Sequence, residues 1–231
     1  MKLAIMQPYF MPYLGYWQLM NAVDTYVVYD NIQYTKKGWF NRNRILLNGK
    51  DYLFTIPLKK DSDYLDVRER AVAEDFNKNK LLNLYKEAYR KAPNFDTFFP
   101  ILEKIVQCEG TNLFKYLYNS ITTIKNLLDI KTDIIISSNI DIDHSLKGKD
   151  KVIAICKQLG ATEYFNAIGG QALYSKEEFQ RNGIDLRFLK SCLPPYPQFK
   201  NAFVEGLSII DVLMFNPREE IAKMLNEYTL V

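Results

Sequence analysis

Two short stretches near the start of the chain hold most of the side chains that could bind or transform a ligand. In the first, tyrosine hydroxyls can donate and accept hydrogen bonds, and the free amides at the start of a helix favour an anion. Its candidate residues are Gln7, Tyr9, Tyr13, Gly15 and Tyr16. A glycine at this place permits the close approach of a flat ligand, or it only eases the packing of a helix against a sheet. Both interpretations of Gly15 stay open at this point.

The second stretch, residues 33–44, mixes basic, aromatic and amide side chains. An arginine fork suits phosphate or carboxylate groups, an asparagine donates and accepts hydrogen bonds, and a tryptophan offers a face for stacking. The candidate substrate-binding residues of this stretch are Lys37, Trp39, Asn41 and Arg42. We predict a ligand site here, although single-stranded nucleic acid can use the same combination.

The wider window from residue 36 to residue 60 is basic. Its cationic residues are Lys36, Lys37, Arg42, Arg44, Lys50, Lys59 and Lys60, against a single acidic residue, Asp51. Such a window is expected to meet an anionic ligand or to form a solvated basic edge. The net charge of the chain is only +3, too small by itself to indicate nucleic-acid binding. We therefore expect a small anionic ligand rather than nucleic acid.

The elements around these stretches are expected to bring them together. Residues 2–6 form a short apolar run that predicts a buried strand, residues 13–22 show helical spacing of apolar residues, and residues 25–30 are β-branched and aromatic. This order predicts a parallel βαβ unit. The loops after its two strands leave the same sheet edge, where open α/β sheets bind ligands. We expect one pocket lined by Gln7, Tyr9, Tyr13, Tyr16, Lys37, Asn41 and Arg42.

Two further polar residues end predicted strands on that edge. Asp30 follows the second strand, where it could orient a sugar hydroxyl or act as a base, although a turn-forming aspartate is the favoured alternative. Ser138 ends the strand predicted at residues 133–138 and is a candidate substrate-binding residue. The candidate catalytic residues are Tyr13, Tyr16 and Asp30.

The rest of the chain extends this pattern. Asn48-Gly49 between apolar runs predicts a β-hairpin over residues 45–56. Residues 75–129 predict a helical block, separated into helices at Pro93 and Pro100. The remaining predicted elements are strands at 133–138, 163–166 and 184–189 and helices at 151–159, 176–181, 207–213 and 219–225. We predict a single domain over residues 1–231, an α/β fold with a mainly parallel sheet, a helical insertion at about 75–129 and the hairpin.

Composition excludes several other classes of protein. The three cysteines are widely spaced without a CxxC motif, so we expect free thiols and a cytoplasmic protein. The single histidine, His144, lies in a polar stretch that predicts a surface loop, and one histidine excludes a His-rich metal site. No signal peptide is expected, and no apolar run approaches the ~18 residues of a membrane span.

Specific motifs add a family resemblance. Residues 6–50, from MQPYFMPYLGYW to NRNRILLNGK, resemble the opening of the WbqC-like protein family, and the likeness continues through Ser137-Ser138, LGATEYFNAIGG, residues 195–198 and residues 207–211. It covers most of the chain, with residues 5–58 and 150–213 matching most strongly. Family members resemble proteins encoded with O-antigen and other surface-polysaccharide genes, which implies a role in building or modifying sugars.

A second resemblance concerns layout. A strand, a proline-containing loop and Tyr13-Leu14-Gly15-Tyr16 opening a helix are similar to the HxGH signature of adenylyl-transferring enzymes such as pantothenate synthetase. That likeness implies a Rossmann-like, nucleotidyltransferase-like sheet. Both histidine positions are tyrosines here, and tyrosine is uncharged at neutral pH, which speaks against adenylyl transfer while leaving phosphate binding open.

Together these patterns predict an enzyme of surface-polysaccharide biosynthesis, a transferase that uses a nucleotide-activated sugar or an acyl or aminoacyl donor. The alternative is a non-catalytic module that binds a nucleotide sugar or glycan. A paired general acid and base in the pocket would favour the enzyme, whereas a pocket of aromatics, amides and arginines would favour the binding module.

Overall fold

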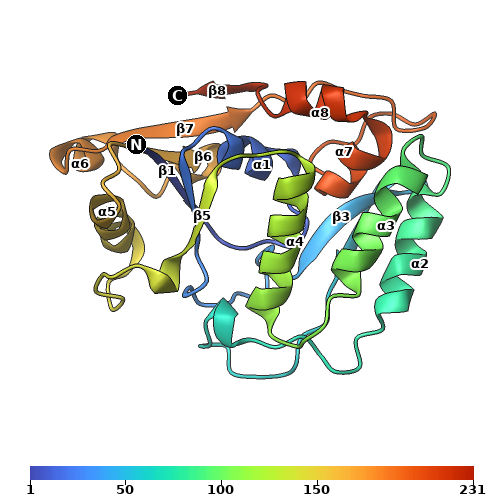
Figure 1. The fold of residues 1–231 in the computed structure, drawn as a ribbon, viewed down its shortest axis with the longest axis horizontal. Coiled ribbons are helices and arrows are strands. Elements are labelled where there is room, and N and C mark those ends of the chain that lie inside the picture. Colours follow the sequence, from blue (N-terminus) through green and yellow to red (C-terminus); the bar gives the residue numbers. More distant parts are fainter.

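A six-stranded sheet forms the centre of the computed structural model, which describes all of residues 1–231 (Figure 1). The strand order is β5-β2-β1-β6-β7-β8. The strands are β1 (Lys2–Met6), β2 (Thr25–Val28), β5 (Asp133–Ile136), β6 (Glu163–Ala167), β7 (Asp185–Ser191) and β8 (Tyr228–Leu230). All pairs are parallel except β7 with β8. The predicted parallel βαβ unit is confirmed, because Leu3 pairs with Thr25 and Met6 with Val28.

Alternate side chains of the sheet face two separate hydrophobic clusters. Ala4 and Tyr26 face the larger cluster, whereas Leu3 and Val27 face the smaller one, as the period of two in a strand requires. The larger cluster contains residues of α1 (Leu14–Asn21), α4 (Leu113–Leu127), α7 (Ile209–Phe215) and α8 (Arg218–Met224). The smaller cluster contains residues of α5 (Gly148–Gln158) and α6 (Lys176–Arg181).

The predicted hairpin forms a separate two-stranded sheet of β3 (Arg42–Leu47) and β4 (Lys50–Thr55). Asn48 and Gly49 both have positive φ, 52° and 76°, as a tight hairpin turn requires. In Figure 1 the hairpin lies with α2 (Lys78–Tyr89) and α3 (Phe95–Val106) at the opposite end of the molecule from α5 and α6. Three single-turn 3₁₀ helices are η1 (Val67–Glu69), η2 (Ser137–Asn139) and η3 (Ile168–Gly170).

Two expectations about secondary structure were wrong. Pro100 does not separate two helices but lies inside α3. Its cost of about 3 kcal/mol is offset because the same helix buries Phe98, Leu102 and Ile105 in the core. The strand β8 was not predicted, since it has only three residues and gains its partners from β7, far away in the sequence.

Two expected features of the whole chain can be checked directly. The three cysteines are free, and burial of Cys156 raises the pKa of its thiol to about 12. No helix is both long and apolar enough to cross a bilayer.

A buried carboxylate joins the hairpin, α2 and the C-terminal part of the chain. Asp211 in α7 is fully buried. Its Oδ1 accepts a hydrogen bond from the Tyr89 hydroxyl (2.9 Å), and its Oδ2 accepts from the Tyr196 hydroxyl (2.7 Å) and from Gln198 Nε2 (2.6 Å). The Tyr89 hydroxyl in turn accepts from the backbone amide of Leu46 in β3 (3.0 Å). One carboxylate therefore connects α7 with the segment 196–198, with α2 and, through Tyr89, with β3.

We expect Asp211→Ala to lower the free energy of unfolding by about 3 kcal/mol or more, because three buried donors lose their acceptor at about 1–3 kcal/mol each. Denaturant unfolding measures this. Asp141→Ala, which alters an exposed aspartate, should change stability by less than about 0.5 kcal/mol. Equal effects of the two substitutions would contradict the role of the Asp211 cluster.

The pH dependence of stability gives a second readout of the same cluster. Burial raises the pKa of Asp211 above its ordinary value, although the hydrogen bonds from Tyr196, Gln198 and Tyr89 lower it. A raised folded-state pKa contributes stability that is present below the unfolded-state pKa and is lost as pH rises through the folded-state value. As pH rises from about 4, the ordinary value for aspartate, through the raised folded-state pKa, the wild-type protein should therefore lose stability relative to Asp211→Asn.

Candidate functional site

The loop after β1 is held in place by side chains from distant parts of the chain. Met11 has a left-handed φ of 47°, which is uncommon for a residue with a side chain. Asn43 Nδ2 in β3 donates to the carbonyls of Phe10 (3.1 Å) and Met11 (2.6 Å), and Ser208 Oγ before α7 donates to Met11 (2.7 Å). Buried carbonyl groups need such partners, so the loop has one defined conformation.

A cavity of about 290 Å³ lies where this loop meets β3 and the segment before α7. It is lined by Tyr9, Pro12, Tyr13, Trp39, Asn43, Arg44 and Gly206. The lining combines aromatic rings, an amide and an arginine, with no carboxylate. This is the place where the two stretches singled out in the sequence come together, and we take it as the candidate site, the Tyr9–Trp39–Arg44 pocket.

The ring of Tyr13 lies across the start of α1. A Cβ atom placed on Gly15 would come within 2.4 Å of Cε2 of Tyr13, closer than atoms can approach. A larger residue here would have to displace the exposed Tyr13 ring, so in this structure the contact that glycine relieves is with an aromatic ring of the chain itself. The glycine allows Tyr13 to fold back and form a wall of the pocket.

The two pocket tyrosines are hydrogen-bonding groups rather than bases at neutral pH. Burial, together with the neighbouring Tyr13, raises the pKa of Tyr9 to about 12. Burial also raises the pKa of Tyr13. The Tyr9 hydroxyl donates to Oε1 of Gln7 (3.0 Å), so the half-buried Gln7 orients Tyr9.

Two arginines from the predicted basic stretch have different roles. Arg42 donates from Nε to the carbonyl of Gly38 (2.8 Å) and from Nη2 to the carbonyl of Lys37. It therefore closes the turn before β3 rather than lining the pocket. Arg44 lines the pocket, and its Nε lies 3.6 Å from Oδ2 of the exposed Asp51. Both guanidinium groups lie 5.3 Å from the centre of the Trp39 ring.

Besides Arg42, four residues expected in the pocket do not line it: Gln7, Tyr16, Asn41 and Lys37. Gln7 only contacts the Tyr9 hydroxyl. Tyr16 is 1% exposed, and its ring packs on Tyr9 (6.0 Å between centres) within the core. Asn41 is buried, and its side chain donates to the carbonyl of Ile56 (2.7 Å) and accepts from the Tyr34 hydroxyl (2.9 Å). Lys37 is exposed on the turn. Residues of both stretches thus line one cavity, but sheet topology does not determine which side chains of a loop point into it.

Asp30 and Ser138 lie together at the carboxyl ends of β2 and β5. Asp30 is 2% exposed. Its Oδ1 accepts from Ser137 Oγ (2.8 Å) and from the amide of Ser138 (2.9 Å), and its Oδ2 accepts from Ser138 Oγ (2.7 Å). Both carboxylate oxygens are thus engaged in joining two strand ends, and neither residue lines the pocket. The exposed His144 lies beside them, with Nδ1 3.0 Å from Nδ2 of Asn31.

The candidate residues include Arg42 where Arg44 lines the pocket, and they lack three other lining residues, Pro12, Asn43 and Gly206. Strand alternation does not separate the two arginines, because Arg42 and Arg44 fall on the same face of β3 while Asn43, from the opposite face, also lines the pocket. Gly206 lies 162 residues after Arg44 in the sequence, and no local sequence pattern predicts that it lines the pocket.

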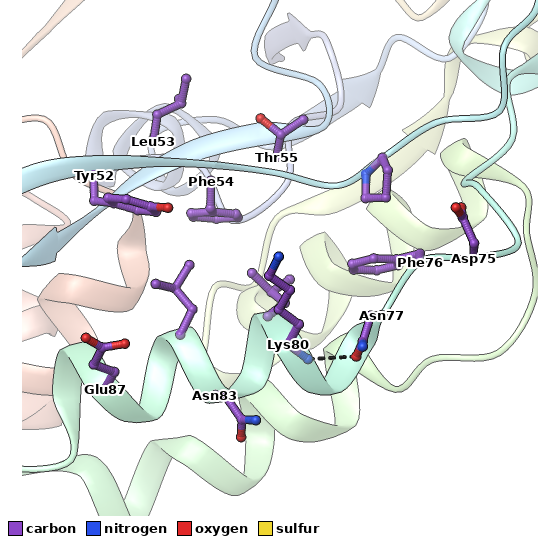
Figure 2. A pocket seen from close by; sticks show the side chains of 13 residues that line it. Tyr52, Leu53, Phe54, Thr55, Asp75, Phe76, Asn77, Lys80, Asn83 and Glu87 are labelled. Atoms are coloured by element: carbon purple, nitrogen blue, oxygen red, sulfur yellow. Dashed lines mark hydrogen bonds between the residues drawn. The ribbon is translucent and has the colours of Figure 1, made fainter.

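A larger groove of about 750 Å³ lies between β4 and α2. Figure 2 shows Tyr52 and Phe54 of β4 pointing toward α2, with Lys80 and Glu87 on the helix. This groove shares no residue with the Tyr9–Trp39–Arg44 pocket, and its charged side chains have mixed sign. No group of three or more histidine, cysteine, aspartate or glutamate side chains is placed to hold a metal ion.

A double-mutant cycle tests the contact of Tyr13 with Gly15. In a Tyr13→Ala background, Gly15→Ala should stabilise the protein by up to about 1 kcal/mol, because alanine favours the helix. In the wild-type background the gain should be smaller or reversed, because the new methyl group must displace the Tyr13 ring. Chemical denaturation of the four proteins gives the coupling energy, and a coupling of zero would contradict the ring position.

Comparisons with known proteins agree with the resemblance seen in the sequence. The profile of the WbqC-like protein family matches residues 7–223. The uncharacterized protein Rv1507c of Mycobacterium tuberculosis is 29% identical over 222 residues, which cover 93% of this chain and 93% of that relative. No solved structure matches the chain. Because the family match spans nearly the whole chain and includes every residue that lines the pocket, the chain belongs to the WbqC-like protein family.

Proposed function

We propose that this protein binds an anionic, hydroxyl-rich small molecule, such as a nucleotide sugar, in the Tyr9–Trp39–Arg44 pocket. The observation that carries the proposal is the meeting of tyrosine hydroxyls, an indole and a half-exposed guanidinium in one cavity of about 290 Å³. Arginine recognises phosphate with paired donors, and aromatic rings with polar tips suit a sugar or base. A cavity near the lower end of the usual size for ligand sites suits one part of such a ligand.

The position of the pocket in the sheet supports the same proposal. Counted in chain order, the five parallel strands have the order 3-2-1-4-5, which supports a Rossmann-like sheet of the nucleotidyltransferase-like type. In such sheets the order reverses at the first strand, and ligands bind beyond its carboxyl end. The loop that supplies Tyr9 and Tyr13 follows that strand, β1.

The chemistry of the lining favours binding over group transfer. No carboxylate lines the cavity, and the raised pKa values of Tyr9 and Tyr13 make both poor bases at neutral pH. The other residues considered for catalysis, Tyr16 and Asp30, are buried outside it. We therefore propose a non-catalytic module that holds a nucleotide sugar or glycan precursor. The family resemblance suggests that this precursor is used in surface-polysaccharide synthesis.

Tryptophan fluorescence offers a direct test. The chain has two tryptophans; Trp17 is fully buried and Trp39 is 38% exposed at the pocket. Titration with a panel of nucleotides and nucleotide sugars should change the emission of Trp39, and Trp39→Phe should remove the change. A bound ligand should also raise the melting temperature, since it binds only the folded state.

Arg44→Ala should weaken binding of the responding ligand by about 1.5–3 kcal/mol, the range for a hydrogen bond to a charged group. Arg44→Lys should restore only part of the affinity because the planar fork is lost. Arg181→Ala, at an exposed arginine of α6, is the matched control and should bind like wild type. If no member of the panel binds, or if the Arg44 and Arg181 variants bind equally well, the proposal fails.

A further inference from the structure

Arg70, just after η1, is a buried cation without an acidic partner. Its side chain is 4% exposed, and it takes part in none of the salt bridges of the protein. Nη1 donates to the carbonyl of Ser62 (2.8 Å) and Nη2 to the carbonyl of Lys59 (3.2 Å). The buried Nε has no hydrogen-bond partner. Buried charges are normally paired, so this guanidinium lacks an anion.

The guanidinium lies at a basic cavity of about 520 Å³. Lys36, Lys59 and Lys60 line the cavity together with Arg70, and Asp61 is its single carboxylate. Lys36 is paired with Asp63 outside the lining (3.0 Å). Lys59 and Lys60 form no salt bridge and are exposed, so three cations remain for a ligand.

Tyr34 also lines this cavity, and the nearby cationic side chains act on its hydroxyl. Arg70 lies 4.9 Å from the centre of the Tyr34 ring, a cation–π arrangement that holds the guanidinium in place. Burial raises the pKa of the Tyr34 hydroxyl, whereas the charges of Arg70, Arg42 and Lys36 lower it. Three cations thus act on one point, and an anion bound there would be stabilised by the same field.

We propose that this cavity binds the diphosphate group of a small molecule, with Arg70 as the buried fork and Lys59 and Lys60 at the entrance. Arginine recognises phosphate oxygens with two parallel donors. Lys59, Lys60 and Arg70 stand against one lining carboxylate, Asp61, which leaves a net charge of about +2, the size that a single phosphate monoester of about −1.5 to −2 would balance. The diphosphate follows instead from the separation of the cations, because two linked phosphoryl groups can contact the buried arginine and the entrance lysines at the same time. The site goes beyond the function proposed above, because it shares no lining residue with the Tyr9–Trp39–Arg44 pocket.

The test uses inorganic pyrophosphate as the probe, and its binding is measured by isothermal titration calorimetry at fixed ionic strength. The wild-type protein should bind it, and the double variant Lys59→Gln/Lys60→Gln should bind at least about tenfold more weakly with an unchanged melting temperature, since both side chains are exposed. Lys50→Gln is the matched control, because Lys50 belongs to the same basic window but lines neither cavity. It should bind pyrophosphate as wild type does.

Arg70→Met separates a ligand site from a structural clamp. In the wild-type protein pyrophosphate should raise the melting temperature, and this rise should disappear in Arg70→Met. The proposal is overturned if pyrophosphate neither binds nor stabilises the wild-type protein, which would leave Arg70 as a clamp on residues 59–62. It is also overturned if Arg44→Ala, rather than the double lysine variant, abolishes binding, because the anion would then occupy the other pocket.

Discussion

The buried carboxylate of Asp211 is the group on which the relative arrangement of the hairpin, α2 and α7 depends. Its oxygens accept hydrogen bonds from Tyr89, Tyr196 and Gln198, and the Tyr89 hydroxyl also accepts a hydrogen bond from a backbone amide of β3. A carboxylate withdrawn from water is costly unless such donors surround it. The hairpin, α2 and α7 must therefore meet in one orientation, because any other would leave this charge without its partners.

That constraint reaches the pocket through the two elements it fixes. Once β3 and α7 are in place, Asn43 and Ser208 stand where they can donate to the carbonyls of Phe10 and Met11. The loop after β1 is thereby held in an uncommon conformation, with Met11 at positive φ. A loop whose carbonyls are satisfied by side chains in this way pays little ordering cost on binding. For the ligand proposed above, the pocket is therefore preorganised.

The basic stretch of the sequence is divided by the fold into two separate surfaces. Arg44 faces the pocket beside Trp39, whereas Lys59 and Lys60 surround a second cavity with Arg70. Arg42 lines neither cavity and instead donates to the carbonyls of residues 37 and 38. Charge counted along a sequence window therefore does not say how many separate basic surfaces the fold makes from it.

The sequence by itself determined the elements whose signals are local. The parallel βαβ unit followed from apolar runs and helical spacing within residues 2–30, and the hairpin followed from Asn48-Gly49. Tertiary structure decided that Pro100 stays inside a helix and that Arg44 rather than Arg42 lines the pocket. The reason is one of range: turn chemistry and periodicity act over a few residues, whereas side-chain orientation in the pocket depends on bonds such as that of Ser208 to Met11, 197 positions apart.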